Sequence, residues 1–153
     1  MSFRITGLPA ETFAPLFELS DAELKARGGV RRAASGGEPC RISLTDAEPG
    51  DDLILVNHEH QPADSPYRMR YAVFVRLDER RFDAVDVIPE QLSRRMLAVR
   101  SFDNDGMNVA HALVQGGDAL GGVISSFLAD PAAVYLHVHF ASAGCYAARV
   151  DRA

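Results

Sequence analysis

Hydrophobic and polar side chains alternate most regularly between Val134 and Phe140, in the sequence VYLHVHF. Because successive side chains of a strand point to opposite faces, this pattern predicts a strand with one buried face and one polar face. The polar face carries Tyr135, His137 and His139. A phenol and two imidazoles therefore share one surface of the predicted strand.

Two other segments follow a helical pattern. Ser20 and Glu23 have the spacing of a capping box, which predicts a helix that starts after Ser20 and stops at Gly28. From Leu120 to Leu128 the apolar residues recur at the intervals of an amphipathic helix, and we expect Asp118 to cap it. Shorter helices are expected after Pro9 and over Pro89 to Arg95, and a proline is tolerated in the first turn of a helix.

Shorter apolar or alternating runs predict the remaining strands. They are Phe3 to Thr6, Cys40 to Leu44, Leu53 to His58, Tyr71 to Arg76, Met96 to Phe102, Met107 to Val114 and Cys145 to Val150. Loops are expected over Arg31 to Glu38 and over Glu59 to Pro66. Seven or eight strands and three or four short helices, without regular alternation, favour an α+β fold with a mostly antiparallel curved sheet.

The length and composition fit a single domain, 1–153, of an ordinary globular protein. A net charge of −5 disfavours nucleic acid as a partner, and no apolar run is long enough to span a membrane. The N-terminus lacks the pattern of a secretory signal, so we expect a cytoplasmic protein with reduced thiols at Cys40 and Cys145.

The last two strands are expected to form a hairpin whose loop ends at Gly144, since a three-residue loop commonly ends in a left-handed glycine. With that loop, Cys145 and Arg149 join the two histidines on one face. A four-residue loop shifts each partner by one and moves Cys145 and Arg149 to the opposite face.

Three interpretations of this face remain open. It can line a pocket for a small anionic molecule, with an arginine on the anion and a histidine or Cys145 in a catalytic role. His137 and His139 can instead bind a transition metal, because alternate strand positions bring two imidazoles to one side. In the third interpretation the face is structural, or it lies in a homodimer interface.

Two further features carry expectations. The sequence His58-Glu59-His60 lacks the spacing of a zinc protease motif and is interpreted as a solvated loop cluster. Arg100 lies in an apolar strand, and we expect it to form an ion pair with Asp103 or Asp105.

Four stretches in order also match a known pattern: Pro39 to Asp51 (PCRISLTDAEPGD), Ser65 to Arg76 (SPYRMRYAVFVR), Leu97 to Met107 (LAVRSFDNDGM) and Tyr135 to Val150 (YLHVHFASAGCYAARV). They resemble the short bacterial proteins of the domain-of-unknown-function family DUF1203. The resemblance extends over nearly the whole chain. It implies a bacterial, cytoplasmic, single-domain protein, and it implies no reaction.

The sequence therefore predicts a protein of unknown activity with a pocket for a small anionic molecule around the final hairpin. Whether it is an enzyme stays open, no cofactor is specified and no metal ligand is assigned. The candidate catalytic residues are His137, His139 and Cys145. The candidate ligand-binding residues are Tyr135, Arg149, Arg100 and Cys40.

Overall fold

A computed structural model describes all 153 residues and contains two antiparallel sheets. The six-stranded sheet has the order β5-β1-β9-β8-β6-β7, and the three-stranded sheet has the order β2-β3-β4. The strands are β1 (Phe3–Thr6), β2 (Gly29–Ala33), β3 (Asp52–Gln61), β4 (Met69–Arg76), β5 (Asp83–Val85), β6 (Met96–Phe102), β7 (Asn108–Gln115), β8 (Tyr135–Phe140) and β9 (Tyr146–Arg152). The α+β class is confirmed, with nine strands divided between two sheets.

Four α-helices and one 3₁₀ helix complete the fold. They are α1 (Ala10–Phe13), η1 (Ala14–Glu18), α2 (Asp21–Ala26), α3 (Glu90–Ser93) and α4 (Asp118–Ala129). None of these helices has both the length and the apolar character needed to cross a membrane.

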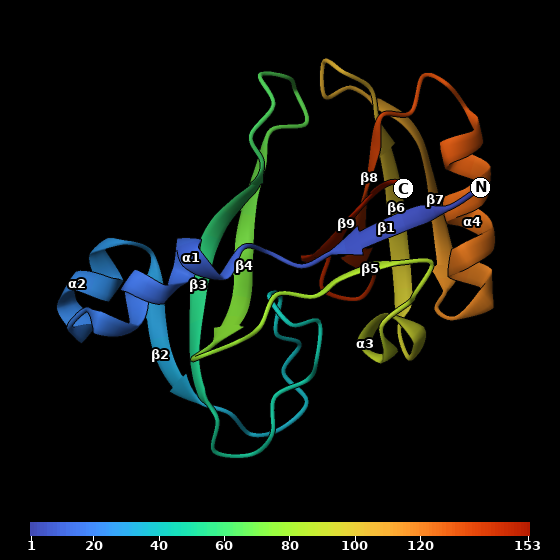
Figure 1. The fold of residues 1–153 in the computed structure, drawn as a ribbon. Helices are drawn as coiled ribbons and strands as arrows, with labels where there is room; N and C mark the ends of the chain where they lie inside the picture. The colour runs from blue at the N-terminus through green and yellow to red at the C-terminus, as the bar shows by residue number, and fades with distance from the viewer.

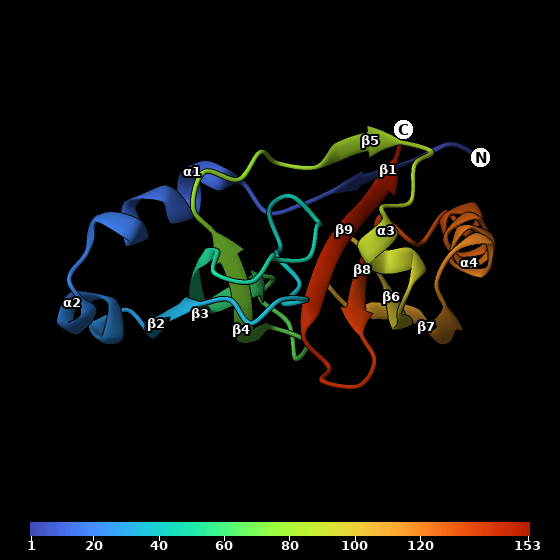
Figure 2. The ribbon, with the colours of Figure 1, turned by 90° about the horizontal axis from the view of Figure 1, so that it is seen from below.

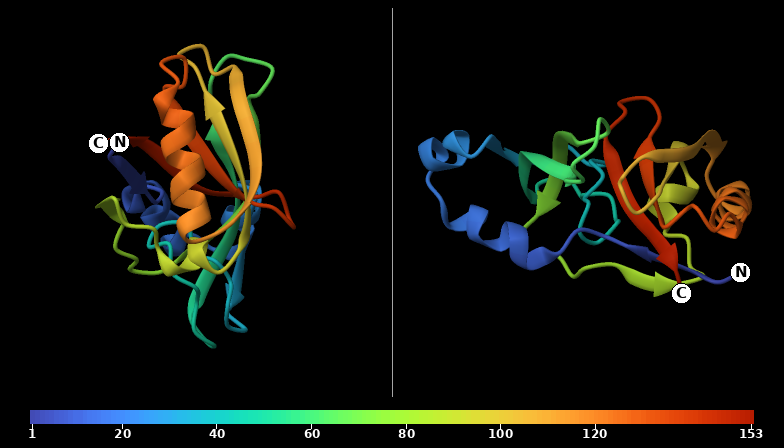
Figure 3. Two further views of the ribbon diagram at one scale, coloured as in Figure 1. Left: turned by 90° about the vertical axis from the view of Figure 1, so that its right-hand side faces the viewer. Right: turned by 90° about the horizontal axis from the view of Figure 1, so that it is seen from above.

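The molecule has three layers, with the six-stranded sheet in the middle. Figures 1 and 2 show α4 on one side of this sheet and the three-stranded sheet on the other. Figure 3 shows α4 lying along its face of the sheet, with the two chain ends close together. The ends meet because β1 pairs with β9, the last strand. The apolar residues of β8 pack toward α4, and its histidines look toward the three-stranded sheet, where His60 of β3 meets them.

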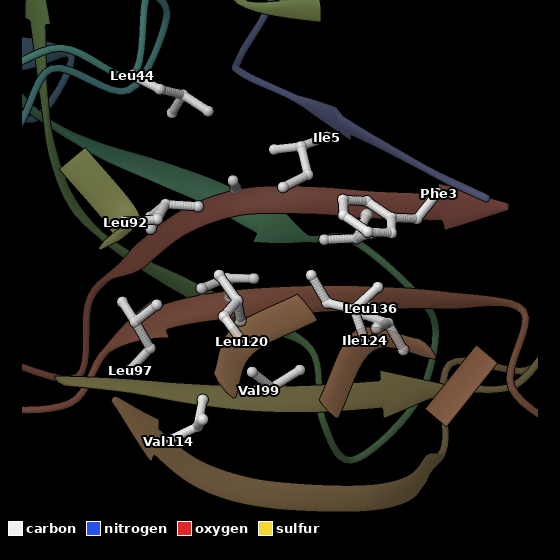
Figure 4. Packing of buried hydrophobic residues seen from close by; sticks show 14 of the residues in the cluster. Phe3, Ile5, Leu44, Leu92, Leu97, Val99, Val114, Leu120, Ile124 and Leu136 are labelled. Atoms are coloured by element: carbon white, nitrogen blue, oxygen red, sulfur yellow. The ribbon is translucent and has the colours of Figure 1, made fainter. Parts of the chain in front are cut away.

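The larger hydrophobic core lies between α4 and the six-stranded sheet. The helical stripe predicted from the sequence forms it, since Leu120, Ile124 and Leu128 are buried while the rest of α4 is not. Figure 4 shows Leu120 and Ile124 among side chains such as Val99 of β6 and Leu136 of β8. Burying each such side chain stabilises the fold by about 1.5–3 kcal/mol.

The helix boundaries follow from local capping. The capping box is confirmed: the Glu23 amide donates to Ser20 Oγ at 3.2 Å, and the Ser20 amide donates to the Glu23 carboxylate at 2.8 Å. The prediction that Asp118 caps α4 is wrong by one residue. Gly117 is the N-cap and Asp118 is the first helical residue, where its negative charge favours the helix N-terminus.

Three segments differ from the sequence expectation. Residues 29–33 form strand β2 although a loop was expected from Arg31, because backbone pairing with β3 holds a strand whose side chains are mostly exposed. Residues 40–44 were expected to form a strand but make only an isolated bridge before a turn, and Leu44 has a φ of 53°. Residues 59–61 were expected in a loop but continue β3, which brings His60 into the structure's interior.

Candidate functional site

The β8–β9 hairpin combines features of both predicted registers. Phe140 faces Cys145 across a four-residue loop, and His139 therefore lies opposite Tyr146. A bulge after this pair restores the other register, so that His137 faces Arg149 as expected.

The consequence is a divided set of candidate residues. The predicted convergence of His137, His139 and Cys145 is wrong, because the four-residue loop turns Cys145 to the other side of the hairpin. There Cys145 packs in the α4 core and lines a separate cavity. Tyr146 takes its place on the histidine face.

His60 is the residue that completes the histidine face. Its ring, at the end of β3, stacks on Tyr146 with the ring centroids 4.9 Å apart and the planes at 18°. It meets His139 edge-on at 5.3 Å and His137 at 6.1 Å. The three imidazoles are 7% exposed or less, so the interpretation of His60 as part of a solvated loop is wrong.

A cavity of about 290 Å³ opens beside these three rings. It lies between the end of the β3–β4 hairpin and the strands β6 and β8, and we call it the histidine cavity. Its walls are His60, Gln61, Pro66, Tyr67, Arg68, Met69, Arg100, Phe102, His137 and His139.

Burial keeps the three imidazoles neutral near pH 7. It lowers the pKa of His60 to about 4, and the charges of His139, His58 and Arg100 act in the same direction. Burial, helped by the Arg100 charge, also lowers the pKa of His139 to about 4. The pKa of His137 falls well below its ordinary value, again chiefly through burial. Each ring therefore offers one N–H and one lone pair.

Hydrogen bonds fix the tautomer of one ring and leave the others without partners. His139 Nδ1 lies 3.0 Å from the Gly144 carbonyl oxygen. Since a carbonyl only accepts, Nδ1 carries the proton and Nε2 presents a lone pair. Both ring nitrogens of His60 and Nδ1 of His137 are buried without a hydrogen-bond partner. A buried polar atom of this kind costs about 1–3 kcal/mol until a ligand or a water satisfies it.

Arg100 supplies an unpaired positive charge to the histidine cavity. The prediction that Arg100 forms an ion pair with Asp103 or Asp105 is wrong, because Arg100 forms no ion pair. The Asp103 carboxylate instead accepts hydrogen bonds from the Asp105 and Met107 amides and shapes the turn. The only side-chain partner of Arg100 is the Met69 sulfur at 3.8 Å. The register places Arg100 directly opposite His137 on the neighbouring strand.

Arg149 and Tyr135 share the histidine face, but their polar groups already have partners. The Arg149 guanidinium pairs with both oxygens of Asp151 at 2.7–3.0 Å and lies 4.2 Å over the Tyr135 ring. The Tyr135 hydroxyl exchanges hydrogen bonds with the Gln61 amide at 2.9 and 3.2 Å. These contacts position the face and leave Arg100 as its unpaired cation.

Cys40 lies outside both cavities. It is fully buried with Ala34, Ala47 and Leu53, and burial raises the pKa of its thiol to about 12. Cys145 instead accepts a hydrogen bond from Arg41 Nη2 at 3.0 Å. Both cysteines are free.

His60 and Arg41 are site residues that no sequence pattern predicts. Periodicity gave no sign that β3 runs past His58, and His60 becomes part of the site only because the two sheets meet there. Arg41 looks like any charged residue in the sequence, yet its side chain is 2% exposed.

The structure contains no group of three or more His, Cys, Asp or Glu side chains that could hold a metal ion. The arrangement thus defines an α+β protein with a neutral three-histidine cavity beside an unpaired arginine. Residues 37–152 match the family model described as a protein of unknown function, DUF1203, and the chain belongs to this family. No curated protein and no solved structure matches the chain.

Proposed function

We propose that this protein binds a small oxyanion that also carries a hydroxyl group, in the histidine cavity. The ligand class includes hydroxycarboxylates and hydrogen phosphate. The observation that carries the proposal is the unpaired Arg100 guanidinium beside buried imidazole nitrogens that have no partner in the protein.

The charge of the ligand follows from Arg100. A guanidinium is always protonated near pH 7 and binds carboxylate and phosphate oxygens through a planar fork of N–H groups. Of the other arginines at the cavity and its face, Arg68 pairs with Glu59 and Arg149 with Asp151. An anion is the group that Arg100 lacks.

The hydroxyl group of the ligand follows from His139. Its Nε2 is an acceptor, because the Gly144 carbonyl holds the proton on Nδ1. A bare carboxylate or sulfate offers no donor to this lone pair. A ligand with an O–H beside its anionic oxygens satisfies both Arg100 and His139.

Two matched ligand pairs test this proposal by isothermal titration calorimetry. Lactate carries a hydroxyl that propionate lacks. Hydrogen phosphate carries an O–H donor that sulfate lacks. We expect the donor-bearing member of at least one pair to bind about tenfold tighter, the effect of one hydrogen bond of about 1.4 kcal/mol. Equal affinity within both pairs, or no binding of any of the four, contradicts the proposal.

Arg149→Gln is the matched control for Arg100→Gln, because both arginines lie on the histidine face. Arg100→Gln removes the unpaired charge and should abolish binding. Arg149 is paired with Asp151, so its replacement should leave most of the affinity. The same loss in both variants would mean that net charge alone, and not Arg100, attracts the anion.

Two other interpretations predict different results. A transition-metal site predicts a stoichiometric ion in protein purified without a nickel column. Finding that ion would contradict the oxyanion proposal. A homodimer predicts a doubled mass by light scattering. Because the β3–β4 hairpin covers the histidine face, such a dimer would use another surface.

We also propose that the protein is bacterial and that it is located in the cytoplasm. Its support is the sequence resemblance together with two buried cysteines that form no disulfide, as is usual in a reducing compartment. Trapping thiols with an alkylating agent at cell lysis should yield two free thiols in the unfolded chain, and a disulfide would argue against this location.

A further inference from the structure

Arg41 is a buried cation without an anion. Its side chain is 2% exposed, and no carboxylate lies within ion-pair distance of it. Its guanidinium donates to the Tyr146 carbonyl at 2.8 Å, to the Pro39 carbonyl, and to Cys145 Sγ at 3.0 Å. These contacts use three of the five N–H donors of a guanidinium. Burying a charge is costly unless an opposite charge accompanies it.

A cavity of about 390 Å³ lies beside Arg41 and shares no lining residue with the histidine cavity. We call it the Arg41 cavity. It runs between this hairpin and the β3–β4 sheet, and Cys145 is on its wall. Most of the lining is apolar, with Leu55, Phe74 and Met96 as large members.

The positive charge of this cavity lies around Phe140. Two guanidiniums lie against the Phe140 ring, with the Arg41 carbon 4.8 Å and the Arg95 carbon 5.3 Å from its centroid. Arg95 is paired with Asp46 at 2.9 Å, so one positive charge remains uncompensated. The cavity therefore combines one uncompensated cation with a mostly apolar lining.

We propose that the Arg41 cavity is a second binding site, which takes a monocarboxylate with an aryl or alkyl body. The carboxylate lies on Arg41 beside Cys145, and the apolar body contacts Leu55, Phe74 and Met96. One negative charge matches the one unpaired guanidinium. This site is separate from the histidine cavity, and the two can succeed or fail independently.

Cys145 provides a chemical reporter for this site. Iodoacetate resembles the proposed ligand in charge, whereas iodoacetamide is its neutral counterpart. In the reaction the Cys145 sulfur forms a bond to the CH₂ carbon, the C–I bond breaks, iodide leaves with the electron pair, and the thiol proton passes to buffer. Cys40, with 0% exposure, is the internal control thiol.

The experiment compares the two reagents on the folded full chain and on the same chain in urea, with peptide mass mapping of Cys145. We expect the iodoacetate-to-iodoacetamide rate ratio to be at least about tenfold higher in the folded chain. Benzoate should protect Cys145 while benzamide does not. An unchanged ratio, or equal protection by both, overturns the proposal.

Two variants test the site without removing the buried positive charge, whose loss could unfold the protein. Arg41→Lys keeps the charge but loses the planar fork, and the rate ratio should fall toward the urea value. Ala72→Phe, on the cavity wall, should block protection by benzoate without touching either arginine. If neither reagent reaches Cys145, a benzoate titration followed by amide NMR replaces the assay. The absence of saturable shifts around Phe140 and Cys145 then overturns the proposal.

Discussion

His60 of the three-stranded sheet and Tyr146 of the six-stranded sheet stack with their ring centroids 4.9 Å apart. Removing the ring in His60→Ala should destabilise the fold by about 2–4 kcal/mol, because the two sheets lose a buried contact. His60→Phe keeps the ring and removes two unpartnered nitrogens, so it should be within about 1 kcal/mol of the original, or more stable.

Urea denaturation at pH 7 measures both variants. A stable His60→Phe variant would mean that the imidazole is kept for a reason other than stability. If Phe is as damaging as Ala, the His60 nitrogens have a structural partner in the protein and are not free for a ligand.

Stability should fall as the solution becomes more acidic. His60 and His139 have a pKa of about 4 in the folded protein against 6.5 when unperturbed. The unfolded chain binds more protons between these values, so the stabilisation is complete above about pH 6.5 and is lost as the pH falls toward 4. Each histidine should contribute about 1–3 kcal/mol to this loss.

The pH dependence is measured as the free energy of unfolding at intervals between pH 7.5 and 4.5, values chosen to bracket the titration of a depressed histidine. His60→Phe should show a shallower slope, because it removes an imidazole whose pKa is lowered by burial. A flat profile for the original protein would contradict the neutral, buried state of the imidazoles.

Gly144 sets the four-residue loop that turns Cys145 away from the histidines. Its φ is +77°, a conformation that costs other residues energy, and no atom would touch an added Cβ. Gly144→Ala should therefore destabilise the protein by about 1 kcal/mol through the backbone alone. Gly144→Asn should cost less, because asparagine tolerates this conformation. Thermal denaturation distinguishes the two, and equal losses would argue against the turn geometry.

Gly7 and Gly122 should respond to alanine in opposite directions. A Cβ on Gly7 would lie 2.0 Å from the Ile42 carbonyl oxygen, and the backbone there has to move. Gly7→Ala should cost about 3 kcal/mol or more. Gly122, inside α4, has open space around it, so Gly122→Ala should stabilise by about 0.5–1 kcal/mol. Chemical denaturation of both variants measures this contrast.

Sequence patterns predicted the elements in which buried and exposed side chains alternate regularly. They failed for elements that form because their backbone pairs with a distant segment. The stripe from Leu120 to Leu128 and the alternation around His137 needed no tertiary information. Strand β2, by contrast, is held by pairing with β3, and its exposed side chains carry no pattern.

Part of the candidate site was predictable from the sequence in the same way. His137 and His139 share a buried face because they alternate on one strand. The loop length decides the face of Cys145, and the observed four-residue loop puts Cys145 opposite the histidines, as that alternative predicts. The bulge that returns Arg149 to the histidine face is a backbone feature that neither loop length predicts. His60 joins the histidine cavity through contacts between the two sheets, and Arg41, in the turn after Cys40, joins the other cavity through hydrogen bonds to Tyr146 and Cys145.

The most direct test of the oxyanion proposal is the ¹⁵N NMR shift of the His139 ring nitrogens at pH 7, without and with lactate or hydrogen phosphate. In the free protein, Nδ1 should carry the proton and Nε2 should be unprotonated. Addition of the ligand should shift Nε2 saturably, and Arg100→Gln should abolish the shift. A protonated Nε2 in the free protein, or no shift with either ligand, would contradict the proposal.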